Sequence, residues 1–166
     1  MKIGVIADSH ENMDLIRKAV DVFNEQEVDL VCHCGDVISP ITAKEFANLE
    51  ASFVGVFGNN DGERHFLRKK FKEIGSFHEE PYEFKVDEKV IQLMHRPLNI
   101  DALVAEGRLD FVFYGHTHSV DIRQDTKPVV VNPGESGAWL TGKGTVAIVD
   151  TEKKEEPVEL IELALA

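Results

Sequence analysis

The sequence predicts an α/β protein with two packed mixed sheets, and two observations favour this class. In the first half of the chain, short β-branched runs alternate with segments that carry apolar residues at helical spacing. In the second half, strand-like runs follow one another with one helical segment among them. Alternating strands and helices are typical of a parallel sheet, and consecutive strands add antiparallel pairs. We therefore expect two sheets flanked by helices, in one domain over residues 1–166.

Three strand and helix pairs are expected in the first half. The strands are the apolar runs at 2–7, 29–34 and 51–58. The helices follow them at 12–26, 39–50 and 63–75. Ser39 is in the N-cap position of the second helix with Pro40 in its first turn, and Gly75 ends the third helix.

The second half is predicted to be mainly β-structure. A hairpin is expected over 82–95 with its turn near Asp87 and Glu88, and one helix is expected over 99–107. Further strands are expected at 109–115, 127–132, 144–150 and 157–163. These strands follow the parallel half, so we expect them to form an antiparallel half of the fold.

Composition narrows the class of partner. With 30 acidic against 18 basic residues the formal charge is −12, which repels polyanions and makes a nucleic-acid polymer a poor partner. No apolar stretch approaches the roughly 20 residues of a membrane span. The two cysteines, Cys32 and Cys34, suit reduced thiols in a strand. We expect a cytoplasmic protein without membrane contact, and a homodimer by base rate.

Metal-type ligands follow five of the predicted strands. They are Asp8 and His10, Asp36, Asn59, His95, and His116 with His118. Taken singly, each has a simpler explanation: Asp8 could cap a helix, and the pair Gly58 and Asn59 is an ordinary turn signal. However, ligands in α/β sheets bind at the carboxyl ends of the strands, so these loops should converge on one site.

The ligand types indicate which metal such a site would hold. Carboxylates, imidazoles and a carboxamide without a thiolate match Mn, Fe, Co, Ni or Zn and argue against calcium, which prefers oxygen ligands. There are enough ligands for two ions, and a carboxylate between two ions can bridge them. We therefore expect two divalent transition-metal ions.

The motifs in chain order resemble one known family. "DSH" (8–10), "GD" (35–36), "GNND" (58–61), His95, "GHTH" (115–118) and "NPG" (132–134) look like the calcineurin-type metallophosphoesterases, specifically their small bacterial and archaeal phosphodiesterase branch. The motifs span most of the chain. The resemblance implies a four-layer α-β-β-α sandwich and a two-metal site.

The resemblance also implies roles for individual residues. One ion would be held by Asp8, His10 and His118, the other by Asn59, His95 and His116, and Asp36 would bridge them. It implies hydrolysis of a small phosphodiester by a hydroxide that bridges the two ions. Asp36 and Asn59 are then the expected catalytic residues, with the Asn59 amide stabilising charge on the phosphoryl oxygens.

The sequence departs from the family pattern at three positions. Asn60 stands where many family phosphatases have a histidine that protonates the leaving group, and an amide cannot act as an acid. Arg96 replaces the usual glycine, and it either grips a substrate phosphate or points to solvent. Asn60 and Arg96 are thus candidate substrate-binding residues. Glu135 precedes Ser136 in the loop that usually reads "NPGS", which leaves substrate contacts there open.

Several alternatives stay open from the sequence alone. Asp61 is expected to hold a neighbouring ligand or to cap a helix. Three roles are open for Trp139: packing a loop, contacting a second subunit, or lining a substrate entrance. The same fold could also serve as a non-catalytic metal-binding or protein-binding scaffold, or as a metal-dependent phosphomonoesterase. The complete ligand set favours an enzyme over the scaffold, and Asn60 disfavours the monoesterase.

Overall fold

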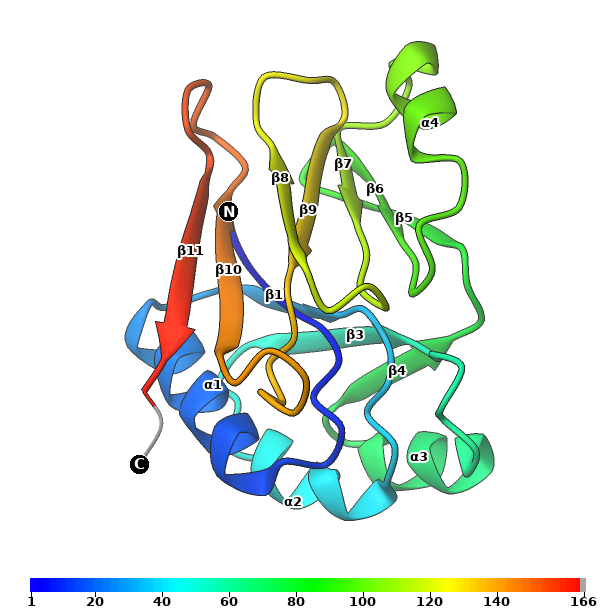
Figure 1. Cartoon of the computed structure of the whole chain (residues 1–166), viewed down its shortest axis with the longest axis vertical. Coiled ribbons are helices and arrows are strands. Elements are labelled where there is room, and N and C mark those ends of the chain that lie inside the picture. Colours follow the sequence, from blue (N-terminus) through cyan, green and yellow to red (C-terminus); the bar gives the residue numbers. More distant parts are fainter. Residues whose placement is uncertain (165–166) are drawn as a thin grey trace.

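The computed structural model describes residues 1–164 and contains two β-sheets packed face to face, with helices on the outer faces (Figure 1). In the first sheet the strand order is β11 (Val158–Leu163), β10 (Gly144–Asp150), β1 (Lys2–Ile6), β2 (Leu30–His33), β3 (Ser52–Val56) and β4 (Gly75–His78). In the second it is β5 (Tyr82–Val86), β6 (Lys89–Leu93), β7 (Phe111–Phe113), β9 (Val129–Pro133) and β8 (Val120–Arg123). Both sheets are mixed, so the predicted fold class is confirmed.

Three apolar clusters separate the four layers. The first cluster packs α1 (Met13–Glu25), α2 (Ala43–Phe46) and α3 (Arg64–Phe71) on the outer face of the first sheet. The second fills the space between the two sheets, and it contains both cysteines. The third packs α4 (Ile100–Glu106) on the outer face of the second sheet. Helices therefore cover both outer faces, and the strand ends are left to form a site.

Periodicity explains the best-predicted elements. In α1 the buried residues fall at helical spacing, from Leu15 to Phe23, and the Asn12 side chain accepts the Leu15 N–H as an N-cap. The predicted hairpin forms as β5 and β6, with Asp87 and Glu88 in left-handed turn conformation. The sequence was sufficient to predict these elements because their backbone hydrogen bonds form within the helix or between consecutive strands.

Two strands and the parallel pairing in the second half of the chain were not predicted. The short strand β4 directly follows α3 and pairs in parallel with the preceding strand β3. The short strand β8 lies where no element was predicted and pairs with the following strand β9. The second half is also not simply antiparallel, because β6, β7 and β9 pair in parallel. For β6 and β7 the expectation was wrong because α4 connects them, and a strand–helix–strand crossover pairs its two strands in parallel.

The predicted helix over 39–50 is much shorter than expected. A 3-10 helix, η1 (Pro40–Thr42), leads directly into α2. Ser39 makes no side-chain capping bond; instead its carbonyl accepts the Thr42 hydroxyl at 2.7 Å. The third helix ends at Phe71 rather than near Gly75, which begins β4.

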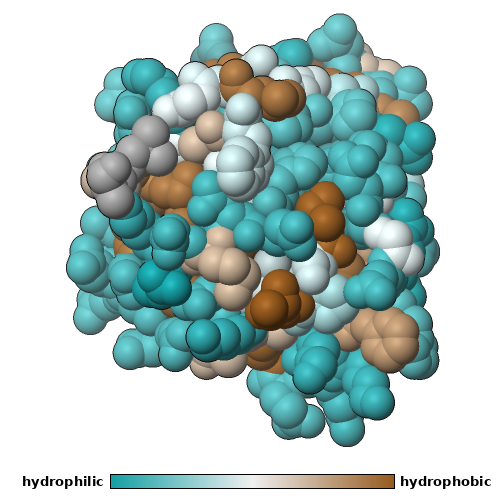
Figure 2. Space-filling view, turned by 60° about the horizontal axis from the view of Figure 1, so that its bottom comes forward, coloured by the Kyte–Doolittle hydropathy of each residue, from teal (hydrophilic) through white to brown (hydrophobic). Residues whose placement is uncertain are grey.

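The molecular surface is mostly hydrophilic. On the side toward the viewer in Figure 2, apolar side chains appear as separate spots rather than as one broad patch. Within residues 1–164, no helix combines the length and the apolar content that crossing a membrane would require.

Candidate metal centre

The carboxyl ends of strands from both sheets meet at one place. Asp8, Asp36 and Asn59 follow β1, β2 and β3 of the first sheet, and these three strands are parallel neighbours. His95 and the His116 loop follow β6 and β7, parallel neighbours in the second sheet. Because the sheets are stacked, the seven side chains expected to bind metal are brought to a common edge.

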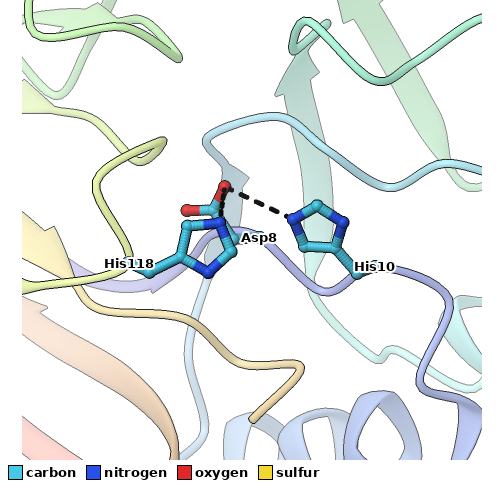
Figure 3. A group of neighbouring side chains, drawn as sticks. All are labelled: Asp8, His10 and His118. Carbon is cyan, nitrogen blue, oxygen red and sulfur yellow. Dashed lines mark ion pairs between the residues drawn. The ribbon is translucent and has the colours of Figure 1, made fainter. Parts of the chain in front are cut away.

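Asp8, His10 and His118, here called the Asp8 group, form the first compact cluster. Asp8 is fully buried, and its Oδ1 lies 3.9 Å from His10 Nε2 and 3.6 Å from His118 Nε2. Figure 3 shows both imidazoles directed at the same carboxylate oxygen. Asp8 Oδ1 and His10 Nε2 are buried and find no hydrogen-bond partner among residues 1–164. Unpaired buried atoms of this kind are costly unless something else binds them.

Asn59, His95 and His116, here called the His95 group, form the second cluster. His95 Nε2 lies 2.8 Å from Asn59 Oδ1 and 3.2 Å from His116 Nδ1. The other ring nitrogen of His95 is 2.9 Å from the Cys34 carbonyl, which fixes the ring orientation. His95 also belongs to a compact group with Asp8 and Asp36, so Asp8 borders both clusters.

Asp36 lies between the two clusters. Its Oδ2 is 3.6 Å from His10 Nε2 and 3.5 Å from His95 Nε2. Asn60 holds this carboxylate with two donors, its backbone N–H at 2.9 Å from Oδ1 and its side-chain amide at 2.8 Å from Oδ2. The position between both histidines is the one a bridging carboxylate needs.

The backbone at this edge is strained. Positive φ angles occur at five of the seven predicted ligands: Asp8 (50°), His10 (41°), Asp36 (59°), His116 (68°) and His118 (57°). For non-glycine residues this region costs about 1–3 kcal/mol each and persists only where the surrounding structure imposes it. The strain aims neighbouring side chains into one volume.

Two glycines make the close approach possible. A Cβ on Gly58 would lie 2.1 Å from Asp36 Oδ1, and a Cβ on Gly115 would lie 2.8 Å from Asp8 Oδ2. Any side chain at Gly58 or Gly115 would push the adjacent carboxylate away. This is why β7 ends before a glycine and only then presents its two histidines.

Three buried or half-buried acids support the ligands, and the sequence pointed to one of them, Asp61. Asp61 accepts the backbone N–H groups of Asp36 at 3.0 Å and Gly58 at 2.7 Å, so its predicted role of holding a ligand loop agrees with the contacts. It does not cap α3, whose N-cap is Glu63.

Glu80 and Glu135 were not predicted as supporting residues. Glu80 accepts the His95 N–H at 2.7 Å. Glu135 is 1% exposed and lies 3.0 Å from His118 Nδ1. Burial opposes the ionisation of Glu135, but hydrogen bonds from Thr141 and His118 outweigh it and lower its pKa below the usual range. A loop position after "NPG" was the only sequence signal for Glu135, and Glu80 had none.

The two candidate substrate residues are engaged by acids. Arg96 donates its Nε–H to Glu80 Oε1 at 2.7 Å, and its side chain remains 54% exposed. Asn60 donates to Asp36 and also lines the pocket beside the Asp8 group.

The electrostatics favour a cation. Burial, and then the neighbouring Asp36 carboxylate, raise the pKa of Asp8 to about 8. Burial lowers the pKa of His10 and of His116, which keeps both imidazoles neutral as metal ligands must be. With neutral imidazoles around acidic groups and two unpaired buried atoms, the donor set fits a divalent ion.

Comparison with known proteins agrees with this geometry. A family model described as the calcineurin-like phosphoesterase superfamily domain matches residues 1–154. The chain belongs to the calcineurin-like phosphoesterase superfamily. Phosphodiesterase MJ0936 of Methanocaldococcus jannaschii is 38% identical over 159 residues, covering 93% of this chain and 96% of that protein. A probable metallophosphoesterase of Methanothermobacter thermautotrophicus is 34% identical, covering 97% and 92% of the two chains.

Solved structures share the fold. A structurally characterised archaeal phosphodiesterase superposes with a TM-score of 0.90 at 38% identity, covering 98% of this chain and 100% of that one. A zinc complex of Vps29 from Entamoeba histolytica superposes with a TM-score of 0.60 at 17% identity, covering 99% and 100%, and is a likeness of fold alone. The predicted family and the predicted class of enzyme, a phosphoric ester hydrolase, are thereby confirmed.

Proposed function

We propose that this protein is a divalent-metal-dependent phosphodiesterase that acts on small phosphodiesters. The observation that carries the proposal is the pair of buried atoms, Asp8 Oδ1 and His10 Nε2, which lack a partner among residues 1–164 where the ligand loops meet. Similarity to phosphodiesterase MJ0936 supports diesters as the substrate class. The acidic surroundings support it as well, because an anionic ester would be repelled unless cations were bound.

The proposed ligand sets follow the two clusters. The Asp8 group would hold one ion, the His95 group would hold the other, and Asp36 would be shared between them. When bound, two such ions lower the pKa of a water to give a hydroxide nucleophile and neutralise charge on the phosphoryl oxygens. Mn, Ni, Co, Fe or Zn suits this mixed nitrogen and oxygen set.

The remaining steps concern the chain's own residues. Asn60 fixes the Asp36 carboxylate through two hydrogen bonds, so the shared ligand is held before substrate arrives. The Asn59 Oδ1 faces His95, and among residues 1–164 its side-chain N–H groups have no hydrogen-bond partner, so they would be available to donate to a phosphoryl oxygen. Asn60 cannot protonate the leaving group as a general acid. Diesters whose leaving groups have a low pKa should therefore react fastest.

The partner and location predictions remain as proposals. A small diester is the proposed partner, and the net charge of −12 disfavours a nucleic-acid polymer. A homodimer and a cytoplasmic location rest on the sequence alone.

The test is metal reconstitution. Metal-stripped protein is assayed with bis(4-nitrophenyl) phosphate and 4-nitrophenyl phosphate after addition of Mn, Ni, Co, Zn or Mg. We expect diester turnover that requires metal and falls by at least roughly 1000-fold in Asp36→Asn. Asp21→Asn, the same change at an exposed position of α1, should match the wild type.

The outcomes separate the candidate functions. Bound metal without turnover would contradict the proposal and favour the scaffold. Faster hydrolysis of the monoester than of the diester would favour the monoesterase instead.

A further inference from the structure

Two large apolar side chains stand exposed beside the Asp8 group. Trp139 is 64% exposed and Leu140 is 75% exposed. They border a pocket of about 410 Å³ that opens onto the proposed metal ligands. Its lining residues are His10, Glu11, Asn60, His118, Trp139 and Leu140. An aromatic and an aliphatic wall thus face a cluster that is otherwise polar.

The segment that carries these side chains is fixed to the ligands. The Glu135 carboxylate accepts the backbone N–H of Trp139 at 3.0 Å and of Leu140 at 2.9 Å. The same carboxylate lies 3.0 Å from His118 Nδ1. In addition, the Trp139 indole N–H donates to the His10 carbonyl at 3.2 Å. One buried acid therefore sets the position of a ligand histidine and of the apolar wall together.

This arrangement bears on the three roles left open for Trp139. A tryptophan that only packs a loop would bury most of its ring, whereas this ring is mostly exposed next to the site. A planar exposed ring binds another planar group by stacking, and the stacking tolerates any nucleobase because every base has a π-face. A fixed ring also binds at low entropic cost, because the segment is already ordered.

We infer that Trp139 and Leu140 form a subsite for the planar aromatic substituent of the diester, a nucleobase or an aryl group. The inference rests on the proposed function, with the phosphate placed at the Asp8 group. It narrows the substrate class from small phosphodiesters in general to diesters that carry an aromatic group. Diesters with only alkyl substituents would then bind weakly.

The first experiment measures KM and kcat for bis(4-nitrophenyl) phosphate in the metal-loaded enzyme. Trp139→Ala should raise KM roughly tenfold while kcat stays within about twofold. Trp139→Phe loses the indole N–H bond to His10 but keeps an aromatic face, so its KM should stay within about twofold of the wild type. Unchanged KM in Trp139→Ala would overturn the inference. Equal weakening in both variants would also overturn it, because the hydrogen bond would then be the cause.

The second experiment needs no turnover. Trp139 is the single tryptophan of the chain, so its emission reports directly on this subsite. Adenosine monophosphate should quench the emission saturably in the metal-loaded protein, and methyl phosphate at the same concentration should not. Quenching without diester hydrolysis would refute the proposed function and reduce the inference to a binding site for planar aromatic groups at Trp139. Hydrolysis without quenching would refute the inference alone.

A third measurement addresses a second copy of the chain as the occupant. Light scattering of the wild type and Trp139→Ala should give the same mass. A dimer that becomes a monomer in Trp139→Ala would overturn the inference, because the ring would then be covered by the partner subunit rather than by substrate.

Discussion

The Asp8 group and the His95 group contain similar ligand types but differ in how their atoms are satisfied. In the Asp8 group, Asp8 Oδ1 and His10 Nε2 have no hydrogen-bond partner among residues 1–164. In the His95 group, His95 Nε2 already lies close to Asn59 Oδ1 and His116 Nδ1. An ion at the first group would satisfy atoms that are costly to leave unpaired, whereas an ion at the second must replace existing contacts. For the two proposed ions, this difference predicts unequal affinities.

The largest expected effect is on the affinities of the two metal-binding steps. Calorimetric titration of the metal-stripped protein with Mn should show a tighter and a weaker step. His118→Ala should weaken the tighter step at least roughly 100-fold, because it removes a ligand from the Asp8 group. His116→Ala should weaken only the other step.

Exposed His65 on α3 provides the control, since His65→Ala removes an imidazole away from the site. Loss of the same step in both ligand variants would contradict the comparison, because the two groups would then behave as one.

A smaller effect is expected from the acids that support each group. Glu135 contacts His118 Nδ1, whereas Glu80 holds the backbone N–H of His95. Glu135→Gln should weaken the tighter step roughly 10- to 100-fold, because the supporting carboxylate orients the ring and raises its basicity. Glu80 contacts His95 only through the backbone N–H of His95, and its other oxygen accepts the Arg96 Nε–H, so Glu80→Gln should weaken the other step by less. Equal effects on one step would show that the acids do not act through separate groups.

The proposed ligands could be predicted from the sequence, whereas two of the supporting acids could not. The strands of β1, β2 and β3 are strongly apolar, and polar residues directly after them must lie at the sheet edge, so Asp8, Asp36 and Asn59 could be placed together. Glu80 and Glu135 lie in loops without periodicity, and their roles depend on contacts between distant segments. The parallel pairing of β7 with β9 likewise depends on two strands that are not consecutive, because β8 lies between them in the sequence.

The smallest expected effect concerns Asp36, the carboxylate that both groups border. Asn60 donates two hydrogen bonds to it, one from the backbone and one from the side chain. Asn60→His would lose the side-chain bond but would place a proton donor beside the leaving group. We expect the ratio of kcat/KM for phenyl phosphate to kcat/KM for bis(4-nitrophenyl) phosphate to rise roughly tenfold, because only the poorer leaving group needs the acid.

Asn60→Ala is the matched variant, since it loses the same side-chain bond and adds no acid. It should slow both esters by a similar factor, so that the ratio stays near the wild-type value. If Asn60→His and Asn60→Ala gave the same ratio, the missing acid would not explain a preference for diesters. Asn60 would then matter for holding Asp36 between the two groups, and the preference would have to arise from the organic substituent bound beside Trp139.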